Sequence, residues 1–364
     1  MELNAYTYSF PFKEPFITSA EVFTERKGLI LELKEEEDDI IALGEAAPLP
    51  GFSLESLDEV IQQMKKISEE FKELFQNEIS LESLQVFHRK NDIYPSLQFA
   101  LDTLATDYLS QKSRTPAQDL LFDNPAKLLQ TNGIVPISEE RETRDNVAKL
   151  IDKGYKTIKF KIGQNFTYEL EELKIIRSAH PKLNLRLDAN KAWETDEAIE
   201  NLTRLEPLDI EYCEEPLARA NVQNFKALHN ATAVPLALDE SLPEFKDWDS
   251  ILPLISAIII KPMVLGGLTK LFATNRLADN HGNKVIYTTS LESGIGRAMT
   301  VILAAGLGNR DSAHGLSTGS LLNMDVWNDG TYINNGSVNL PDRSQLGKRY
   351  HSNHKYLEPG RIDL

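Results

Sequence analysis

The chain has 364 residues, and its hydrophobic share of 41% and charged share of 26% are those of an ordinary globular protein. A net charge of −16 argues against nucleic acid and anionic membrane surfaces as partners, because neutralising phosphate groups requires clustered Lys and Arg. The single cysteine, Cys213, excludes an internal disulfide and any multi-cysteine metal site, and we expect it to be buried.

The same sequence gives an expectation about location. No window approaches the roughly 18 apolar residues of a membrane span, and the first residues, Met1 to Asn4, lack the basic and apolar regions of a signal peptide. We therefore expect a cytoplasmic protein that does not bind membranes, either a monomer or a homo-oligomer.

Residues 1–125 are predicted to form a mixed α+β domain. Apolar runs predict three strands, and the acidic segment 35–39 is typical of a hairpin turn. Two later segments carry apolar residues at helical spacing. A loop rich in Pro and Gly, residues 48–53, lies between the predicted sheet and these helices.

From about residue 130 the pattern changes to short β-branched runs separated by charged helical stretches. Eight such runs, each followed by a helical segment, predict a (β/α)8-type barrel, fold class α/β. The predicted strands are Gly133–Ile137, Thr157–Ile162, Asn184–Leu187, Asp209–Cys213, Pro235–Leu238, Ala257–Ile260, Lys284–Thr288 and Asp311–Leu316. We place the barrel at 126–325 and expect the tail, 326–364, to return to the N-terminal segment and complete a capping domain.

Five ionisable residues end consecutive predicted strands: Lys161, Asp188, Glu214, Asp239 and Lys261, separated by 27, 26, 25 and 22 positions. One βα unit has about that length, and all strands of a barrel end at one shared mouth. Each acid alone could instead cap the following helix. Three acids in register, bracketed by lysines, favour a metal site of hard oxygen ligands, which suits Mg²⁺, and Mn²⁺ could substitute for it.

The two lysines of the segment 157–163 are predicted to point into the barrel. The period of two places Lys159 and Lys161 on one side of the strand, opposite an apolar face that packs on helices. A crowded lysine loses pKa and becomes usable as a general base, so Lys159 would be the electrostatic helper of Lys161. Lys261 ends a very apolar strand, across the mouth from Lys161, and needs a local anion or a function.

These strand-end motifs, Lys159-Phe160-Lys161, Asp188-Ala189-Asn190, Glu214-Glu215-Pro216, Asp239-Glu240-Ser241 and Lys261-Pro262, resemble those of the enolase superfamily, muconate-lactonizing subgroup. The resemblance covers nearly the whole chain. It implies a Mg²⁺ site at Asp188, Glu214 and Asp239 and catalysis by a lysine base, a mechanism carried over from the superfamily.

Three further segments resemble the o-succinylbenzoate synthase family of menaquinone biosynthesis. They are Gly44–Ser53, Thr289–Gly296 and His314–Gly319. The resemblance implies a lyase that dehydrates a small anionic cyclohexadiene carboxylate. Substrate-binding positions would be Gly51 and Phe52 in the capping domain and Ser290, Glu292 and Ser293 after strand seven, although the two serines could equally be ordinary loop hydrogen-bonders. The role of His314 stays open.

In the implied mechanism Lys161 removes the proton α to the carboxylate and then protonates the departing hydroxyl, while Lys261 stabilises the intermediate as a cation. The main alternative is a racemase of N-succinylamino acids or an epimerase of dipeptides that uses both lysines as bases. Sugar-acid dehydration fits less well, because its catalysts present a histidine where this chain reads residues 287–290. A non-catalytic binding barrel is the third reading.

Overall fold

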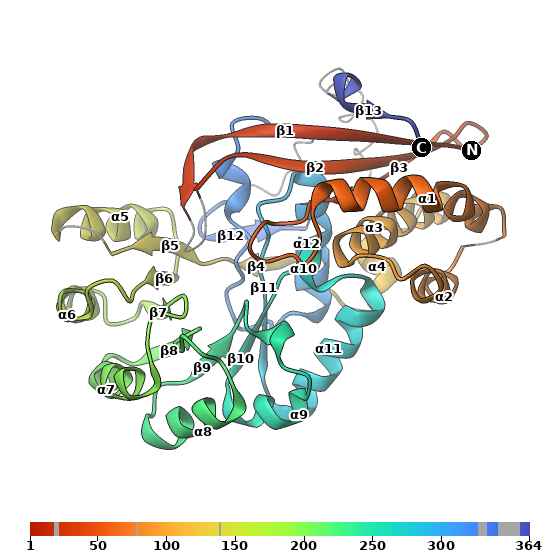
Figure 1. Cartoon of the computed structure of the whole chain (residues 1–364). Helices are drawn as coiled ribbons and strands as arrows, with labels where there is room; N and C mark the ends of the chain where they lie inside the picture. The colour runs from red at the N-terminus through yellow and green to blue at the C-terminus, as the bar shows by residue number, and fades with distance from the viewer. Residues whose placement is uncertain (18–21, 78, 138–139, 327–332, 341–356) are drawn as a thin grey trace.

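The computed structural model describes residues 1–364 except 18–21, 78, 138–139, 327–332 and 341–356. A capping domain lies over one end of a barrel, and the two chain ends lie close together on the cap (Figure 1). No helix in the described ranges is long and apolar enough to cross a membrane.

The capping domain is built on a four-stranded antiparallel sheet with the strand order β13-β1-β2-β3. The acidic turn expected at residues 35–39 is present, because β2 ends at Glu35 and β3 begins at Ile40. The cap elements are β1 (Glu2–Ile17), β2 (Val22–Glu35), β3 (Ile40–Ala46), α1 (Leu57–Gln76), α2 (Leu81–Asn91), α3 (Pro95–Ser113) and β13 (Arg361–Ile362).

One face of this sheet packs on helices α1 to α3. The buried face of α1 carries Val60, Met64, Ile67 and Phe71, and a capping box between Ser56 and Glu59 fixes its start. Helix α3 approaches β3 closely, since a Cβ atom on Gly44 would collide with the backbone oxygen of Ala100. The helices predicted from apolar spacing are therefore present and cover the sheet.

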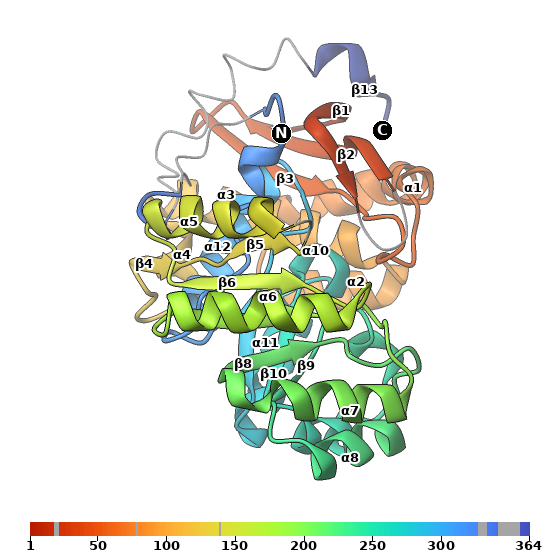
Figure 2. The same cartoon turned by 90° about the vertical axis from the view of Figure 1, so that its left-hand side faces the viewer.

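The barrel sheet has seven parallel strands in the order β11-β10-β9-β8-β7-β6-β5. Each strand begins after a helix on the outside, and Figure 2 shows α5 to α8 stacked along one flank. The strands are β5 (Gly133–Pro136), β6 (Thr157–Lys161), β7 (Asn184–Asp188), β8 (Ile210–Glu214), β9 (Leu236–Leu238), β10 (Ala257–Ile260) and β11 (Lys284–Tyr287).

The helices of the barrel domain alternate with these strands. They are α4 (Ala117–Leu121), α5 (Glu140–Asp152), α6 (Phe166–Ala179), α7 (Thr195–Leu205), α8 (Val222–Ala231), α9 (Trp248–Ile251), α10 (Pro262–Leu265), α11 (Leu268–His281) and α12 (Gly294–Leu307). Short 3₁₀ turns occupy Glu206–Leu208, Leu242–Glu244, Leu252–Leu254, Thr318–Leu321 and Glu358–Gly360.

The predicted eighth strand is reduced to two bridging residues. His314 bridges to Thr131 and Gly315 bridges to Thr288, both in parallel orientation, so the segment still closes the ring between β11 and β5. The prediction of a continuous strand over Asp311–Leu316 is wrong in extent, because residues 311 and 312 form a turn and a bend. The closed ring and its cap agree with the predicted (β/α)8-type barrel and capping domain.

The C-terminal tail reaches the cap by way of the barrel. Strand β12 (Ser337–Asn339) pairs with β4 (Leu128–Gln130) beside the barrel. Farther along, β13 pairs antiparallel with β1, with Ala5 opposite Ile362. The expected return to the capping domain is therefore confirmed, whereas the stop beside the barrel was not predicted.

Candidate functional site

Strand register brings the predicted residues to one layer of the barrel mouth. Lys161 lies beside Asp188, and Asp188 lies beside Glu214. Alternation places these side chains inside the barrel, because Ile158, Phe160 and Leu187 on the other face are buried in the core against the helices. Cys213 is buried on that outer face, as expected for an inert thiol.

Lys159 is the centre of an ion-pair cluster one layer below. Its Nζ lies 2.9 Å from Asp188 Oδ2 and 3.1 Å from Glu214 Oε1. Burial alone would lower the pKa of Lys159, but Asp188 and Glu214 override this and raise it well above its usual value. Lys159 is therefore held in its charged form.

The pKa values of the two buried acids Asp188 and Glu214 are shifted in opposite directions. Burial raises the pKa of Glu214 well above its usual range, with Lys159 opposing and Asp188 and Asp239 adding to the rise. Burial also acts to raise the pKa of Asp188, yet Lys159 outweighs it and holds that pKa below its usual value. Several buried carboxylates thus lie close together, and added positive charge would reduce the repulsion between them.

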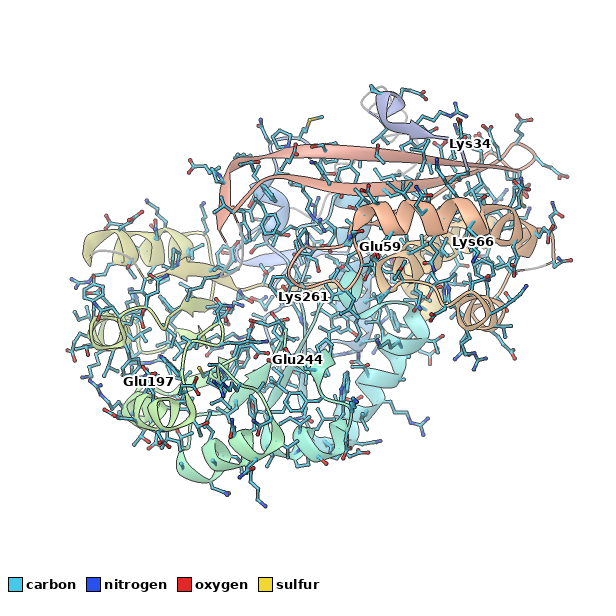
Figure 3. The ribbon with its side chains drawn as sticks, viewed as in Figure 1. Lys34, Glu59, Lys66, Glu197, Glu244 and Lys261 are labelled. Carbon is cyan, nitrogen blue, oxygen red and sulfur yellow. The ribbon has the colours of Figure 1, made fainter. Side chains whose placement is uncertain are left out.

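Lys261 lies opposite this cluster, at the start of α10, and forms an ion pair with Asp239. Its Nζ also lies 4.7 Å from the centre of the Phe52 ring, which comes from the capping domain. Burial acts to lower the pKa of Lys261, but Asp239 and Glu214 raise it overall. Figure 3 shows Lys261 between the barrel and the cap loop.

The three acids follow one another on β7, β8 and after β9, but they do not converge as a ligand set. Among the residues that the structure describes, no group of three His, Cys, Asp or Glu side chains is arranged to hold a metal ion. Asp188 and Glu214 turn to Lys159, and Asp239 turns to Lys261. Their chemistry nevertheless fits Mg²⁺, since all are hard oxygen donors in a layer where burial makes uncompensated charge costly.

We call the strand-end residues Lys161, Asp188, Glu214, Asp239 and Lys261 the ladder. A second set of acids supports the turn that carries Asp239. Glu215 is buried and accepts hydrogen bonds from the backbone N–H groups of Asp239 and Ser241 and from the Ser241 hydroxyl, at 2.7, 2.9 and 2.7 Å. Glu215 has a positive φ of 45°. Burial raises the pKa of the adjacent Glu240 to about 8, and Asp239 and Glu215 add to that rise. Glu215 therefore fixes the turn that carries Asp239.

Glu292 and Ser293, predicted to contact the substrate after strand seven, are buried and hydrogen-bonded within the protein. Glu292 is buried and accepts a hydrogen bond from Thr300 Oγ1 at 2.9 Å and another from the Ser290 backbone N–H. Ser293 is the N-cap of α12, and its hydroxyl donates to Glu45 Oε2 at 2.6 Å. Both side chains are engaged in folding the loop, while the buried Ser290 hydroxyl has no hydrogen-bond partner among the described residues.

His314 is buried outside the mouth. Its Nδ1 accepts from the Tyr287 backbone N–H at 3.1 Å, and a Cβ on Gly308 would collide with its ring. Burial lowers the pKa of His314 to about 3, so the ring is neutral. The residue whose role the sequence left open thus packs between β11 and the end of α12.

Two apolar residues of β5, which we call the apolar wall, line the barrel interior and were not predicted from the sequence. Ile134 pairs in register with Lys159, and Pro136 pairs with Lys161, so both face the barrel interior. Ile134 keeps 42% of its surface exposed, although its neighbours Gly133 and Val135 are buried. The alternation within Gly133–Pro136 could have identified these two residues, had it been aligned with the next strand.

Two family models match the chain. Residues 142–351 match the model described as "Enolase C-terminal domain-like", which covers more than half of the chain. Residues 1–106 match the model described as "MenC, N-terminal domain". The first match spans Lys159, Lys161, the three acids and Lys261, and the second spans the cap loop that carries Phe52.

The curated relatives divide between two kinds of chemistry. A D-Ala-D/L-Ala epimerase of Cytophaga hutchinsonii is 25% identical over 96% of this chain and 95% of its own. An N-succinyl-L-Arg/Lys racemase of Bacillus cereus is 23% identical over 73% of each chain. An o-succinylbenzoate synthase of Thermobifida fusca is 31% identical, over 54% of this chain and 62% of its own.

A solved structure shares the fold. The dipeptide epimerase of Enterococcus faecalis V583, complexed with Mg and the dipeptide L-Leu-L-Tyr, has a TM-score of 0.78 and 22% identity, covering 93% of this chain and 96% of that one. At this identity the likeness bears on the fold alone. It shows the same barrel under the same kind of cap.

Proposed function

The chain belongs to the enolase superfamily, and on that premise we propose that it is an o-succinylbenzoate synthase. The reaction is the Mg²⁺-dependent dehydration of 2-succinyl-6-hydroxy-2,4-cyclohexadiene-1-carboxylate to 2-succinylbenzoate. The observation that carries the choice is the match of the capping domain, residues 1–106, to the N-terminal domain of MenC, the menaquinone-pathway synthase family. The barrel match alone would suit any member of the superfamily.

Asp188, Glu214 and Asp239 would hold the metal ion. When bound, Mg²⁺ supplies the positive charge that stabilises negative charge developing on the substrate carboxylate. Release of these acids from Lys159 and Lys261 would accompany loading, because each acid is ion-paired to a lysine in the structure. We propose Mn²⁺ as a substitute on the same oxygen ligands.

Lys161 acts first as base and then as acid. It removes the proton from the carbon α to the carboxylate, and the electron pair left on that carbon moves toward the carboxylate. The protonated Lys161 then gives its proton to the departing hydroxyl, which leaves as water and yields the aromatic ring. Lys159, two residues earlier on the same face of β6, is held charged by Asp188 and Glu214.

Lys261 serves as a fixed cation. Asp239 and Glu214 raise its pKa in the structure, and Lys261 would face the developing anion as a cation. Phe52 covers the same ammonium from the cap side and offers an aromatic surface to the substrate ring. Ile134 and Pro136 form an apolar wall on β5, which also suits a carbocyclic substrate.

The second candidate is an N-succinylamino acid racemase or a dipeptide epimerase. The presence of two lysines, on β6 and after β10, favours it, because racemisation uses a base on each side of the carbon. A dipeptide carries a free ammonium group that needs an acidic partner, however, and the strand-end acids Asp188, Glu214 and Asp239 are already paired with Lys159 and Lys261. The synthase substrate has no ammonium group and needs no such partner.

A substrate panel tests the proposal. Purified protein with Mg²⁺ is offered the cyclohexadiene, a set of N-succinylamino acids and a set of dipeptides, with aromatic product followed by absorbance and racemisation by deuterium incorporation from solvent. The proposal expects the highest kcat/KM for the cyclohexadiene. Turnover of an amino acid derivative without any dehydration of the cyclohexadiene would assign the second candidate instead, and no Mg²⁺-dependent turnover at all would support a binding barrel.

A further inference from the structure

The carboxylate of Glu45 lies where the cap sheet meets the barrel. The surrounding contact is apolar: Tyr8, Leu43 and other cap residues pack with Leu291 and Ile295 of the barrel domain. Glu45 is fully buried on β3. An ionised carboxylate in such a place is costly unless it is fully hydrogen-bonded, so its partners explain why it is there.

Those partners lie at the start of α12. Glu45 Oε1 accepts from the Ser293 backbone N–H at 2.8 Å, and Oε2 accepts from the Ser293 hydroxyl at 2.6 Å and from the Gly296 N–H at 2.7 Å. The Tyr8 hydroxyl donates from the cap side. A Cβ on Gly296 would lie 3.0 Å from Oε2, so glycine leaves room for the carboxylate. The negative charge also compensates the positive end of a 14-residue helix.

The helix start is continuous with the seventh-strand loop, residues 288–293. Leu291 in this loop has a φ of 64°, a left-handed conformation that is strained for a residue with a side chain. Glu292 closes the loop from within by accepting from Ser290 and Thr300. Burial raises the pKa of Glu292, and the nearby charge of Glu45 adds to the rise. One carboxylate from the loop and one from the cap therefore hold the strained turn.

The loop carries one polar atom that these bonds leave free. Ser290 Oγ is buried and has no hydrogen-bond partner among the described residues. It lies three residues after the end of β11, on the side of the barrel where barrel enzymes bind their substrates. A buried hydroxyl without a partner is expected to find one when a ligand binds.

We propose that Glu45 is a positioning residue that acts from the capping domain. It fixes the seventh-strand loop so that the Ser290 hydroxyl is held toward the substrate in the barrel mouth. Docking of the cap onto the barrel therefore also sets the geometry of the loop. The inference rests on the proposed function in taking the mouth as the place of reaction.

A pair of matched variants tests it. Glu45→Gln keeps size but removes the charge and one acceptor. Glu32→Gln is the control, because Glu32 is equally buried on the same sheet and its bonds go to Asn4, Tyr6 and Lys34 within the cap. Glu45→Gln is expected to lower kcat/KM for the cyclohexadiene between about tenfold and a hundredfold, and Glu32→Gln less than about twofold. Equal kcat/KM values for the two folded variants would overturn the proposal.

A double-mutant cycle separates positioning from mere stability. If Glu45 acts through Ser290, adding Ser290→Ala to Glu45→Gln lowers kcat/KM little further, whereas independent roles give multiplied effects and contradict the proposal. Should Glu45→Gln fail to fold, Tyr8→Phe, which removes one of the four hydrogen bonds, replaces it in the cycle with a smaller effect expected in the same direction.

Hydrogen–deuterium exchange adds a readout that needs no substrate. Glu45→Gln is expected to speed amide exchange in residues 288–296 while Glu32→Gln leaves that segment unchanged. Unchanged exchange in both variants would overturn the inference even in an active enzyme. Wild-type protein that turns over no member of the panel would instead refute the proposed function, and the exchange result would stand by itself.

Discussion

The two sides of the barrel mouth use their charged residues differently. On the ladder side, formed by the ends of β6 to β10, Asp188, Glu214 and Asp239 form ion pairs with lysines of the same mouth, and Asp188 also accepts from the Asn190 backbone N–H. On the other side, the seventh-strand loop, the acids Glu45 and Glu292 are bonded to backbone N–H groups and hydroxyls. In the proposed function the ladder acids exchange their lysines for Mg²⁺, whereas Glu45 and Glu292 hold the loop.

This difference distinguishes acids that are available for catalysis from acids that stabilise the fold. Side chains carried by strands reach a shared mouth in a fixed register, so their charges are available to a metal ion and a substrate. The Glu45 carboxylate accepts from N–H groups at the start of α12 that a helix leaves without partners. The presence of an acid near a barrel mouth is therefore weaker evidence for catalysis than the kind of partner it has.

The largest effect is expected for a substitution among the acids proposed to bind the metal ion. Glu214→Gln, or chelation of the wild type, should lower turnover by about 10³-fold or more, because several kcal/mol of charge stabilisation are lost. Calorimetric titration should show weakened Mg²⁺ binding for this variant. Glu292→Gln serves as the matched comparison and should bind Mg²⁺ like the wild type. If Glu292→Gln loses Mg²⁺ and Glu214→Gln keeps it, the two sides have been assigned the wrong way round.

A moderate effect is expected where the cap reaches the ladder. Phe52→Ala should raise KM roughly tenfold with a smaller change in kcat, because covering one aromatic side chain contributes about 1.5–3 kcal/mol. Steady-state kinetics on the cyclohexadiene provide the measurement. Leu54→Ala, at a 93% exposed position of the next turn, is the control and should change neither constant. A Phe52→Ala variant with wild-type KM would remove the cap loop from the binding site.

The smallest effect concerns the two faces of β8. Cys213 precedes Glu214 and should face the helices, where burial raises its pKa well above the usual value. Native protein should therefore not react with a thiol reagent at pH 8, and denatured protein should react with one thiol per chain. Rapid reaction of native protein would mean that Cys213 faces the mouth and that Glu214 does not.

The ladder was predictable from the sequence because its information is local. A strand has a period of two and a βα unit has a nearly constant length, so Lys161, Asp188 and Glu214 could be assigned to one mouth without coordinates. The register observed between β6, β7 and β8 agrees with this. The ion pairs to Lys159 could not be predicted, since they depend on where long side chains turn in a dry interior.

The seventh-strand loop was less predictable because its contacts are not local. Glu292 and Ser293 were expected to meet the substrate, but Thr300 within α12 donates to Glu292, and Ser293 donates to the distant Glu45. The partner of Ser293 lies 248 positions earlier in the chain. The eighth strand shortened for a similar reason, since its neighbours Thr131 and Thr288 offer only one bridge each.

The central claim is that Lys161 removes the proton next to the carboxylate. The most direct measurement is kcat for dehydration of the cyclohexadiene by Lys161→Ala at saturating Mg²⁺, beside circular dichroism and a Mg²⁺ titration. Lys161→Ala should lower kcat by about 10²–10⁴-fold while the fold and Mg²⁺ binding are retained. A folded, Mg²⁺-binding Lys161→Ala protein that turns over at the wild-type rate would contradict it.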